Sequence, residues 1–181
     1  MACDLTLGRL EGCKDALGGI DAVYFVNFGD LGTVTLGTDD EVTDATGTFS
    51  AYKYDLKGAS SYEEAINSSR ENGTTFFAQT LTLSLKGLSK EQSKQLKLMA
   101  WGRPHVVIED RNGNQFMMGL ERGAEVSGGG AASGAAMGDM SGYTITLTAE
   151  EPTSANFMNG GIADDPFDGL TSATATIVVG V

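Results

Sequence analysis

The chain has very little histidine, cysteine or proline: its 181 residues include one His, two Cys and three Pro. A zinc site needs several His or Cys residues at short spacings, and a catalytic triad needs a His beside a nucleophile. Since His105 stands alone and no CxxC pair occurs, we expect His105 to be a strand residue whose ring is satisfied by hydrogen bonds. Cys3 and Cys13 could close a small loop, but without a secretion signal we expect both to be reduced and partly buried.

Long apolar runs are also missing. No stretch is apolar enough to cross a bilayer, and the first residues, MACDLTLGRLEG, have neither the basic start nor the apolar segment of a signal peptide. We therefore expect a soluble protein without membrane binding, made in a cytoplasm. The length fits one domain, residues 1–181, and the 25 glycines fit many strands joined by many turns.

Basic residues are scarce and unevenly placed. The chain has 24 acids against 12 bases, a formal charge of -12, and no Lys or Arg follows Arg122. Most of such a surface should not bind nucleic acid, because phosphate contacts need Lys and Arg. Lys90, Lys94 and Lys97 share one face of a predicted helix, and Arg103 follows it. This basic face is either a solvated surface or a contact with the acidic part of a neighbouring copy in a head-to-tail assembly.

Sequence motifs for common enzyme chemistry are absent as well. The chain contains no GxSxG, no GxxxxGK[ST], and no GxGxxG between a strand and a helix. Asp110, Asn112, Asn114 and Glu121 have the 1, 3, 5, 12 spacing of an EF-hand calcium loop, but the sixth position, where a sharp turn needs Gly, is Gln115. The Asn-Gly pair inside this segment predicts a hairpin instead. We therefore expect no metal, no cofactor, no catalytic residue and no enzyme activity.

What is present is organised around residues 72–121. Residues 74–85 (TTFFAQTLTLSL) end in a clear alternation of polar and apolar residues, which predicts a half-buried strand. Residues 89–92 (SKEQ) have the form of a capping box and predict a helix that ends near Trp101. We expect Trp101 to lie in the core. Residues 105–120 predict a tight hairpin around an Asn-Gly turn.

The rest of the chain adds strands and irregular segments. Strand character is found in residues 22–28, 33–36, 48–56, 143–149 and 171–181. Residues 61–68 fit a strand by alternation and a helix by composition; we favour a hairpin because the turn Arg70–Gly73 follows. Residues 127–138 hold almost only Gly, Ala and Ser, which is typical of a flexible surface loop or of a segment packed tightly against a neighbouring subunit. Residues 1–19 and 150–170 are expected to be irregular, and the terminal strand either closes the sheet of its own domain or adds to another copy.

The order of these elements resembles a known family. Residues 69–74 (SRENGT) lead into the long strand, and a short helix follows at 89–100. The hairpin at 106–119 (VVIEDRNGNQFMMG) and the run 134–143 (GAAMGDMSGY) precede a strand that closes at residues 149–152 (AEEP). This arrangement, over residues 60–157, resembles the tail tube proteins of tailed bacteriophages, which are similar to the tube proteins of contractile injection and type VI secretion systems.

The resemblance implies a mainly β fold with one short helix, a β-barrel or β-sandwich. It also implies hexameric rings that stack into a tube with an acidic lumen, through which DNA passes without specific binding. Sheath, tape-measure, terminator and baseplate proteins would be partners, and the location would be the virion. It assigns residues 1–20 to an N-terminal arm, 59–73 to a loop or hairpin between rings, and 150–181 to a C-terminal arm. The candidate subunit-interface residues are Tyr62, Glu63, Glu64, Arg70, Glu71, Asn72, Lys90, Lys94, Lys97 and Arg103.

Two alternatives stay open beside the tube subunit. One is another virion role, such as a tail terminator, neck, head–tail connector or baseplate hub protein. The other is a monomeric β-sandwich module for binding or adhesion. A tube subunit should present open strand edges, whereas a binding module should have a concave pocket with aromatic or convergent polar groups.

Overall fold

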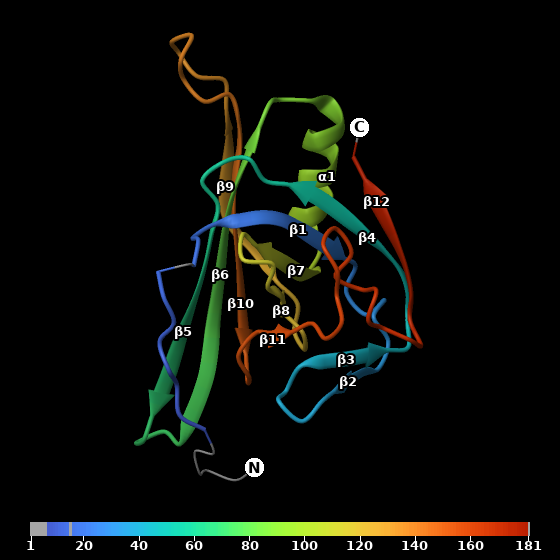
Figure 1. The fold of residues 1–181 in the computed structure, drawn as a ribbon. Coiled ribbons are helices and arrows are strands. Elements are labelled where there is room, and N and C mark those ends of the chain that lie inside the picture. The colour runs from blue at the N-terminus through green and yellow to red at the C-terminus, as the bar shows by residue number, and fades with distance from the viewer. Residues whose placement is uncertain (1–6, 15, 181) are drawn as a thin grey trace.

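The computed structural model describes residues 7–14 and 16–180, and in these residues the fold is mainly β with one short helix, as the sequence predicts (Figure 1). The elements are β1 (Ile20–Val26), β2 (Val34–Leu36), β3 (Val42–Ala45), β4 (Thr48–Asp55), β5 (Ser61–Ser69), β6 (Thr74–Lys86), α1 (Lys90–Trp101), β7 (His105–Asp110), β8 (Gln115–Met118), β9 (Glu125–Ala132), β10 (Gly142–Glu151), β11 (Asn156–Phe157) and β12 (Thr174–Val179). The helix is not long enough or apolar enough to cross a membrane, and no other helix occurs in the described residues.

The strands form two larger open sheets and one small ribbon. The six-stranded sheet has the order β11-β8-β7-β1-β4-β12, and the four-stranded sheet has the order β5-β6-β10-β9. β2 and β3 pair only with each other. The closed β-barrel that the resemblance allows is therefore wrong for the single subunit, because the outer strands of the two sheets do not pair with one another. A β-sandwich-like arrangement is consistent with the structure.

The main core lies between the two larger sheets. It contains Val23 and Phe25 of β1, Leu81 and Leu83 of β6, and Leu147 of β10, all buried. We call the face of the four-stranded sheet that carries these leucines its inner face and the opposite face its outer face. α1 packs on the inner side as well, through the half-buried Leu96 and Met99. Residues 158–170 cover the other face of the six-stranded sheet, where Tyr24 meets Phe167 edge to face.

The predicted hairpin at 61–68 is confirmed, and its helical alternative is wrong. β5 pairs with β6 in antiparallel register from Ser61 opposite Thr82 to Ser69 opposite Thr74. Tyr62 and Glu64 are half-buried while their neighbours Ser61 and Glu63 are exposed, which is the period of two that a strand requires.

The first half of the glycine-rich segment 127–138 is a strand, so a loop over its whole length, one of the two expectations, is wrong; residues 133–138 contain no strand or helix. Residues 125–132 form β9 and pair with β10, Ala131 lying opposite Tyr143 and Gly129 opposite Ile145. Gly, Ala and Ser carry no hydrophobic alternation, so the sequence could not show this strand. The backbone of β10, a strongly amphipathic strand, provides the hydrogen-bonding partner.

The helix begins as predicted, but two details differ. The Ser89 hydroxyl accepts a hydrogen bond from the Gln92 N–H at 3.1 Å, which caps the helix. The reciprocal half of the capping box is wrong, because the Gln92 Oε1 atom is buried without a partner. Placing Trp101 in the core is also wrong: its side chain is 92% exposed, since α1 buries no residue fully and ends in solvent.

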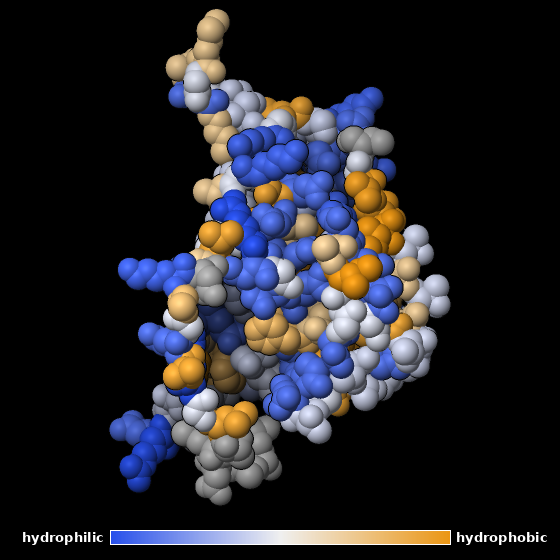
Figure 2. Space-filling model, in the orientation of Figure 1, coloured by the Kyte–Doolittle hydropathy of each residue, from blue (hydrophilic) through white to orange (hydrophobic). Residues whose placement is uncertain are grey.

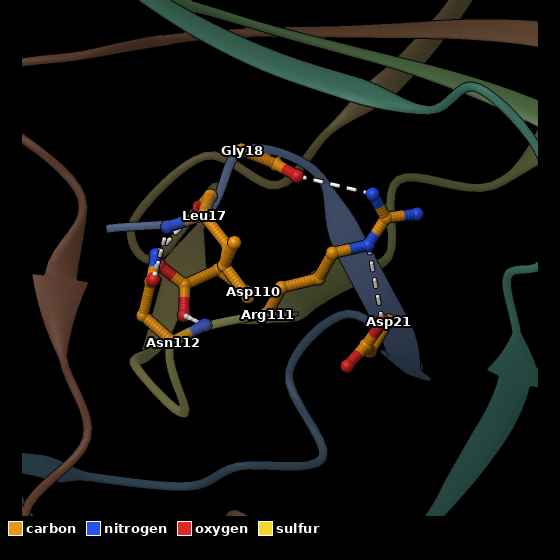
Figure 3. Close-up of polar contacts among 6 residues, drawn as sticks. All are labelled: Leu17, Gly18, Asp21, Asp110, Arg111 and Asn112. Carbon is orange, nitrogen blue, oxygen red and sulfur yellow. Dashed lines mark hydrogen bonds and ion pairs between the residues drawn. The ribbon is translucent and has the colours of Figure 1, made fainter. Parts of the chain in front are cut away.

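The β7–β8 hairpin is confirmed, and its turn holds the N-terminal segment (Figure 3). The Asp110 carboxylate accepts hydrogen bonds from the Asn112 and Asn114 N–H groups, so the residues with calcium-loop spacing close a turn. The Asn112 side chain exchanges two hydrogen bonds with the Leu17 backbone, and Arg111 donates to the Gly18 carbonyl.

Both ends of the chain are now placed in part. Residues 7–14 and 16–19 contain no strand or helix, and all are exposed except Gly19, which is half-buried. Cys13 is exposed, so its expected partial burial is wrong, and Cys3 lies outside the described residues.

At the other end of the chain, β12 pairs in parallel with β4, so the C-terminal strand joins the sheet of its own subunit. It forms an edge of this sheet, on which Val178 and Val179 are exposed. The space-filling view shows apolar surface along the margin of the molecule at this strand (Figure 2). The expected loop at 150–170 contains the short strand β11.

Candidate assembly surfaces

The four-stranded sheet ends in two strands with no neighbour on their outer side, β5 and β9. Each successive pair in this sheet is antiparallel, so β5 and β9 run in opposite directions. An outer strand leaves alternate N–H and C=O groups without partners and is a template for another chain. Among the described residues, no segment covers either edge by pairing with it.

Beyond its first residues, the β9 edge lacks the usual protection against association. Proteins protect exposed edges with charged residues, Pro or bulges. Residues 126–138 contain no charge and no Pro, and the only irregularity of the β9 register lies near its start, opposite Thr146 and Leu147. A Cβ atom at Gly128 or Gly130 would meet nothing within 4 Å, so the subunit itself does not require Gly at these positions. Gly129 differs, because its φ of +155° and the Thr144 carbonyl exclude a side chain.

The β5 edge is charged, and it carries the first group of predicted interface residues. Glu63 is exposed on the outer face. Arg70, Glu71 and Asn72 form the exposed turn at the end of the β5–β6 hairpin, where the Asn72 N–H donates to the Ser69 hydroxyl at 3.3 Å. These four residues are accessible, and their contact with a neighbouring copy stays a prediction.

Tyr62 and Glu64, predicted at the same interface, already have contacts within the subunit. The Glu64 Oε2 atom accepts hydrogen bonds from the Tyr62 hydroxyl (3.0 Å), the Gln79 side chain (3.1 Å) and the Ala155 N–H (2.9 Å). Gln79 is buried, and its Oε1 atom accepts from the Gly119 N–H at 3.0 Å. This network ties the β5–β6 hairpin to the other sheet, and it escaped the sequence because its members are far apart along the chain.

The second group of predicted interface residues lies on and beside α1. Lys90, Lys94 and Lys97 are exposed, and Lys90 pairs only with its neighbour Glu91, at 3.4 Å. The Arg103 guanidinium carbon lies 4.7 Å from the centre of the Phe28 ring, a cation–π geometry. α1 borders β9 and shares a groove with it. The predicted residues therefore fall into two groups, one at each edge of the four-stranded sheet.

The outer face of this sheet is rich in hydroxyl groups. Paired residues of antiparallel strands share a face, and the β6–β10 register pairs Thr80 with Thr148, Thr82 with Thr146 and Ser84 with Thr144. The same registers place three acids on this face, Glu63, Glu125 and Glu150, and among the strand residues of this face the one base is Lys86. The sequence showed the alternation of threonines in each strand but not that the two rows lie side by side.

Two buried ionisable groups, His105 and Glu151, hydrogen-bond to backbone groups. Burial lowers the pKa of His105, whose Nδ1 lies 2.7 Å from the Gly119 carbonyl and whose Nε2 accepts from the Gly29 N–H, which confirms a ring satisfied by hydrogen bonds. Burial raises the pKa of Glu151, although the N–H groups of Glu121 and Arg122 donate to its Oε1 atom. No group of three or more His, Cys, Asp or Glu residues among those the structure describes is arranged to hold a metal ion.

A separate hollow has the lining that a binding module would need. It measures about 480 Å³ and lies between α1 and the strands β1 and β4, with Phe28, Tyr52, Tyr54 and Arg103 in its wall.

Comparisons with protein-family models, with curated proteins and with solved structures give no match for this chain.

Proposed function

We propose that this chain is a virion structural protein, a subunit of a phage tail tube that assembles as stacked rings. The observation that carries the proposal is the pair of unpaired edges, β5 and β9, on opposite sides of one sheet. The two edges differ in chemistry: β5 carries Glu63 and Glu64, while β9 has one charged residue, Glu125 at its start, and is bordered by the basic face of α1. Two different, complementary surfaces on one subunit support head-to-tail association, which forms rings when the rotation closes.

The strand directions fit such a ring. Copies related by rotation about an axis along the sheet keep their strand directions, so β9 of one copy lies antiparallel to β5 of the next. An even number of alternating strands in each subunit thus continues as one antiparallel sheet around the ring. Closure removes every edge of this sheet, as in a barrel.

In a closed ring the outer face of the sheet would line the channel. α1 and the six-stranded sheet occupy the inner side, which leaves the hydroxyl-rich face uncovered. Threonine hydroxyls and the carboxylates of Glu63, Glu125 and Glu150 offer phosphate groups no ion pair, and the acids repel them. Such a lining suits DNA that must pass without binding.

The two ends of the sheet would serve the stacking of rings. The β5–β6 turn and the β9–β10 loop project from opposite ends of the four-stranded sheet (Figure 1). Met137 in the β9–β10 loop is fully exposed, and Ile66 and Phe76 near the other end are exposed as well. Apolar side chains at both ends provide contacts between successive rings.

The aromatic hollow beside α1 favours a second candidate, a β-sandwich binding module. Phe28 and Tyr52 are exposed in a concave surface next to Arg103, which suits an aromatic or apolar ligand. This candidate requires no self-association and leaves the β9 edge without a role.

Negative-stain electron microscopy of the purified chain over a concentration series separates the two candidates. We expect annular or tubular particles whose abundance rises with concentration. Monomers or two-fold dimers at every concentration would overturn the tube proposal and favour the binding module.

A further inference from the structure

The aromatic hollow between α1, β1 and β4 has a single charged residue in its wall. Among the described residues that line it, Arg103 alone carries a charge. The chain as a whole has 24 acids against 12 bases, so a wall with one base and no acid departs from the balance of the molecule. Such a wall favours a negatively charged ligand.

The charge of Arg103 is not neutralised by an ion pair within the subunit. None of the ion pairs among the described residues includes this side chain. Arg103 also borders a neighbouring hollow that contains Glu125 and Glu150, but it forms no ion pair with either. A guanidinium group has five N–H donors in a planar fork that matches a phosphate or a carboxylate. Arg103 is therefore available to bind an anion.

Contacts on Phe28 hold this guanidinium group in place. The Arg103 guanidinium carbon lies 4.7 Å from the centre of the Phe28 ring, and the Phe28 ring stacks on His105 with its centre 5.1 Å away. His105 is buried and held by its hydrogen bonds to Gly29 and Gly119. A side chain that is oriented before the ligand arrives loses less entropy when the ligand binds.

The rest of the wall suits a heteroaromatic ring. Phe28, Tyr52 and Leu98 are exposed, and they offer apolar surface on which a flat ring packs. The amide side chains of Asn27 and Gln95 have both donors and acceptors, as does the edge of a nucleobase. The volume of about 480 Å³ lies in the usual range of small-molecule sites, about 300–1,000 Å³.

We propose that this hollow binds a mononucleotide, whose base packs against Tyr52 and Leu98 and whose phosphate pairs with Arg103. The inference rests on the second candidate function, because it names the ligand of that binding module. No residue of β5 or β9 lines the hollow, so nucleotide binding is compatible with ring formation. A free nucleotide fits better than a nucleic-acid strand, because the formal charge of -12 repels further phosphates.

The first test is isothermal titration calorimetry with adenosine monophosphate, adenosine and inorganic phosphate. Adenosine monophosphate should bind about tenfold more tightly than either of the other two probes, because it alone contacts both parts of the site. Arg103→Gln should weaken its binding by about tenfold and leave the binding of adenosine unchanged. Arg122→Gln is the matched control, since Arg122 is also exposed but lines only the neighbouring hollow. Equal affinities of Arg103→Gln and wild type for adenosine monophosphate would overturn the proposal.

A second variant tests the contact with the base. Tyr52→Leu removes the aromatic ring but keeps an apolar side chain of similar reach, and it should melt close to wild type because Tyr52 is exposed. Adenosine monophosphate and adenosine should both bind about fivefold or more weakly, since stacking contributes about 1–3 kcal/mol per base. Unchanged affinity for both probes would refute the contact between Tyr52 and the base.

The remaining outcomes separate this inference from the functions proposed above. A short oligoadenylate should bind no more tightly than adenosine monophosphate, and tighter binding would overturn the assignment to a free nucleotide. Equal affinities for adenosine and adenosine monophosphate would refute recognition of the phosphate but leave the binding module intact. No binding of any probe would refute the inference, and electron microscopy would still decide whether the chain forms rings.

Discussion

The hydrogen bonds to Glu64 allow a quantitative prediction of how much they stabilise the β5–β6 hairpin against unfolding. In Glu64→Ala the Tyr62 hydroxyl, the Ala155 N–H and the Gln79 side chain lose their common acceptor. Gln79 is only 1% exposed, so water cannot replace Glu64 as the partner of its Nε2 group. Leaving one buried donor unsatisfied costs about 1–3 kcal/mol, and hydrogen bonds to a charged group contribute about 1.5–3 kcal/mol. Since Glu64 is half-exposed, we expect a total loss of about 3 kcal/mol.

A loss of this size is large enough to measure. For a chain of this length, 1 kcal/mol shifts the melting temperature by about 2–4 °C, so Glu64→Ala should melt about 6–12 °C below wild type. Glu64→Gln keeps an acceptor oxygen in the same place and should lose only about 1 kcal/mol. Glu63→Ala removes the neighbouring exposed carboxylate and should stay within about 0.5 kcal/mol of wild type.

The assay is thermal unfolding followed by circular dichroism, at a concentration at which sedimentation shows a monomer. Under this condition a change in assembly cannot contribute to the melting temperature. If Glu64→Ala melted within about 2 °C of Glu63→Ala, the three hydrogen bonds would not stabilise the hairpin, and the reasoning would fail.

Three further predictions concern charge, the C-terminal strand and pH. Reversing Lys90, Lys94 and Lys97 to Glu should weaken assembly in sedimentation without lowering the melting temperature, since all three side chains are exposed; unchanged assembly would refute the charge contact. Deleting residues 174–181 should lower the melting temperature by several degrees because it uncovers β4 and its buried Phe49; a variant as stable as wild type would show that β12 is dispensable. Burial lowers the pKa of His105 below its unfolded value of about 6.5, so this residue's stabilising effect should be complete above that pH and decline as the pH falls toward the folded pKa. The difference in urea midpoint between wild type and His105→Gln should follow this dependence, and a difference that does not change with pH would contradict it.

Local patterns predicted the strands and the helix well where side chains alternate. β6 and β10 carry a clear period of two, and the Ser89 cap and the Asn-Gly turn mark where α1 begins and where β7 turns into β8. β9 could not be predicted, because a strand of Gly, Ala and Ser shows no periodicity and is specified by its partner β10. The sequence also could not predict whether the strands close into a barrel, because closure depends on pairings between distant segments, such as β12 with β4.

The candidate interface was only partly visible in the sequence for the same reason. The basic face of α1 follows from helical spacing alone, and the structure leaves it exposed. Tyr62 and Glu64 looked like surface residues of a strand, but their contacts with Gln79 and Ala155 come from the tertiary fold. Ile66 carries a weak signal, because it continues the alternation of Tyr62 and Glu64. Only the structure shows that this position extends beyond the core.

The response of assembly to salt distinguishes head-to-tail rings from symmetric dimers. A two-fold pair of β5 edges would bring Glu63 and Glu71 of both copies together, and a two-fold pair of β9 edges would bring together the lysine rows of both α1 helices. Both symmetric pairings bring edges of like net charge together, so salt would strengthen them. Pairing of β5 with β9 brings the net acidic edge of one copy beside the net basic margin of the next, where the lysines of α1 outnumber Glu91 and Glu125, so salt would weaken it. The screening length falls from about 30 Å at 0.01 M to about 10 Å at 0.1 M ionic strength. We therefore expect the assembled fraction in sedimentation to decrease over this range. An increase with salt, ending in a stable dimer, would identify a symmetric interface and exclude a ring built through these two edges.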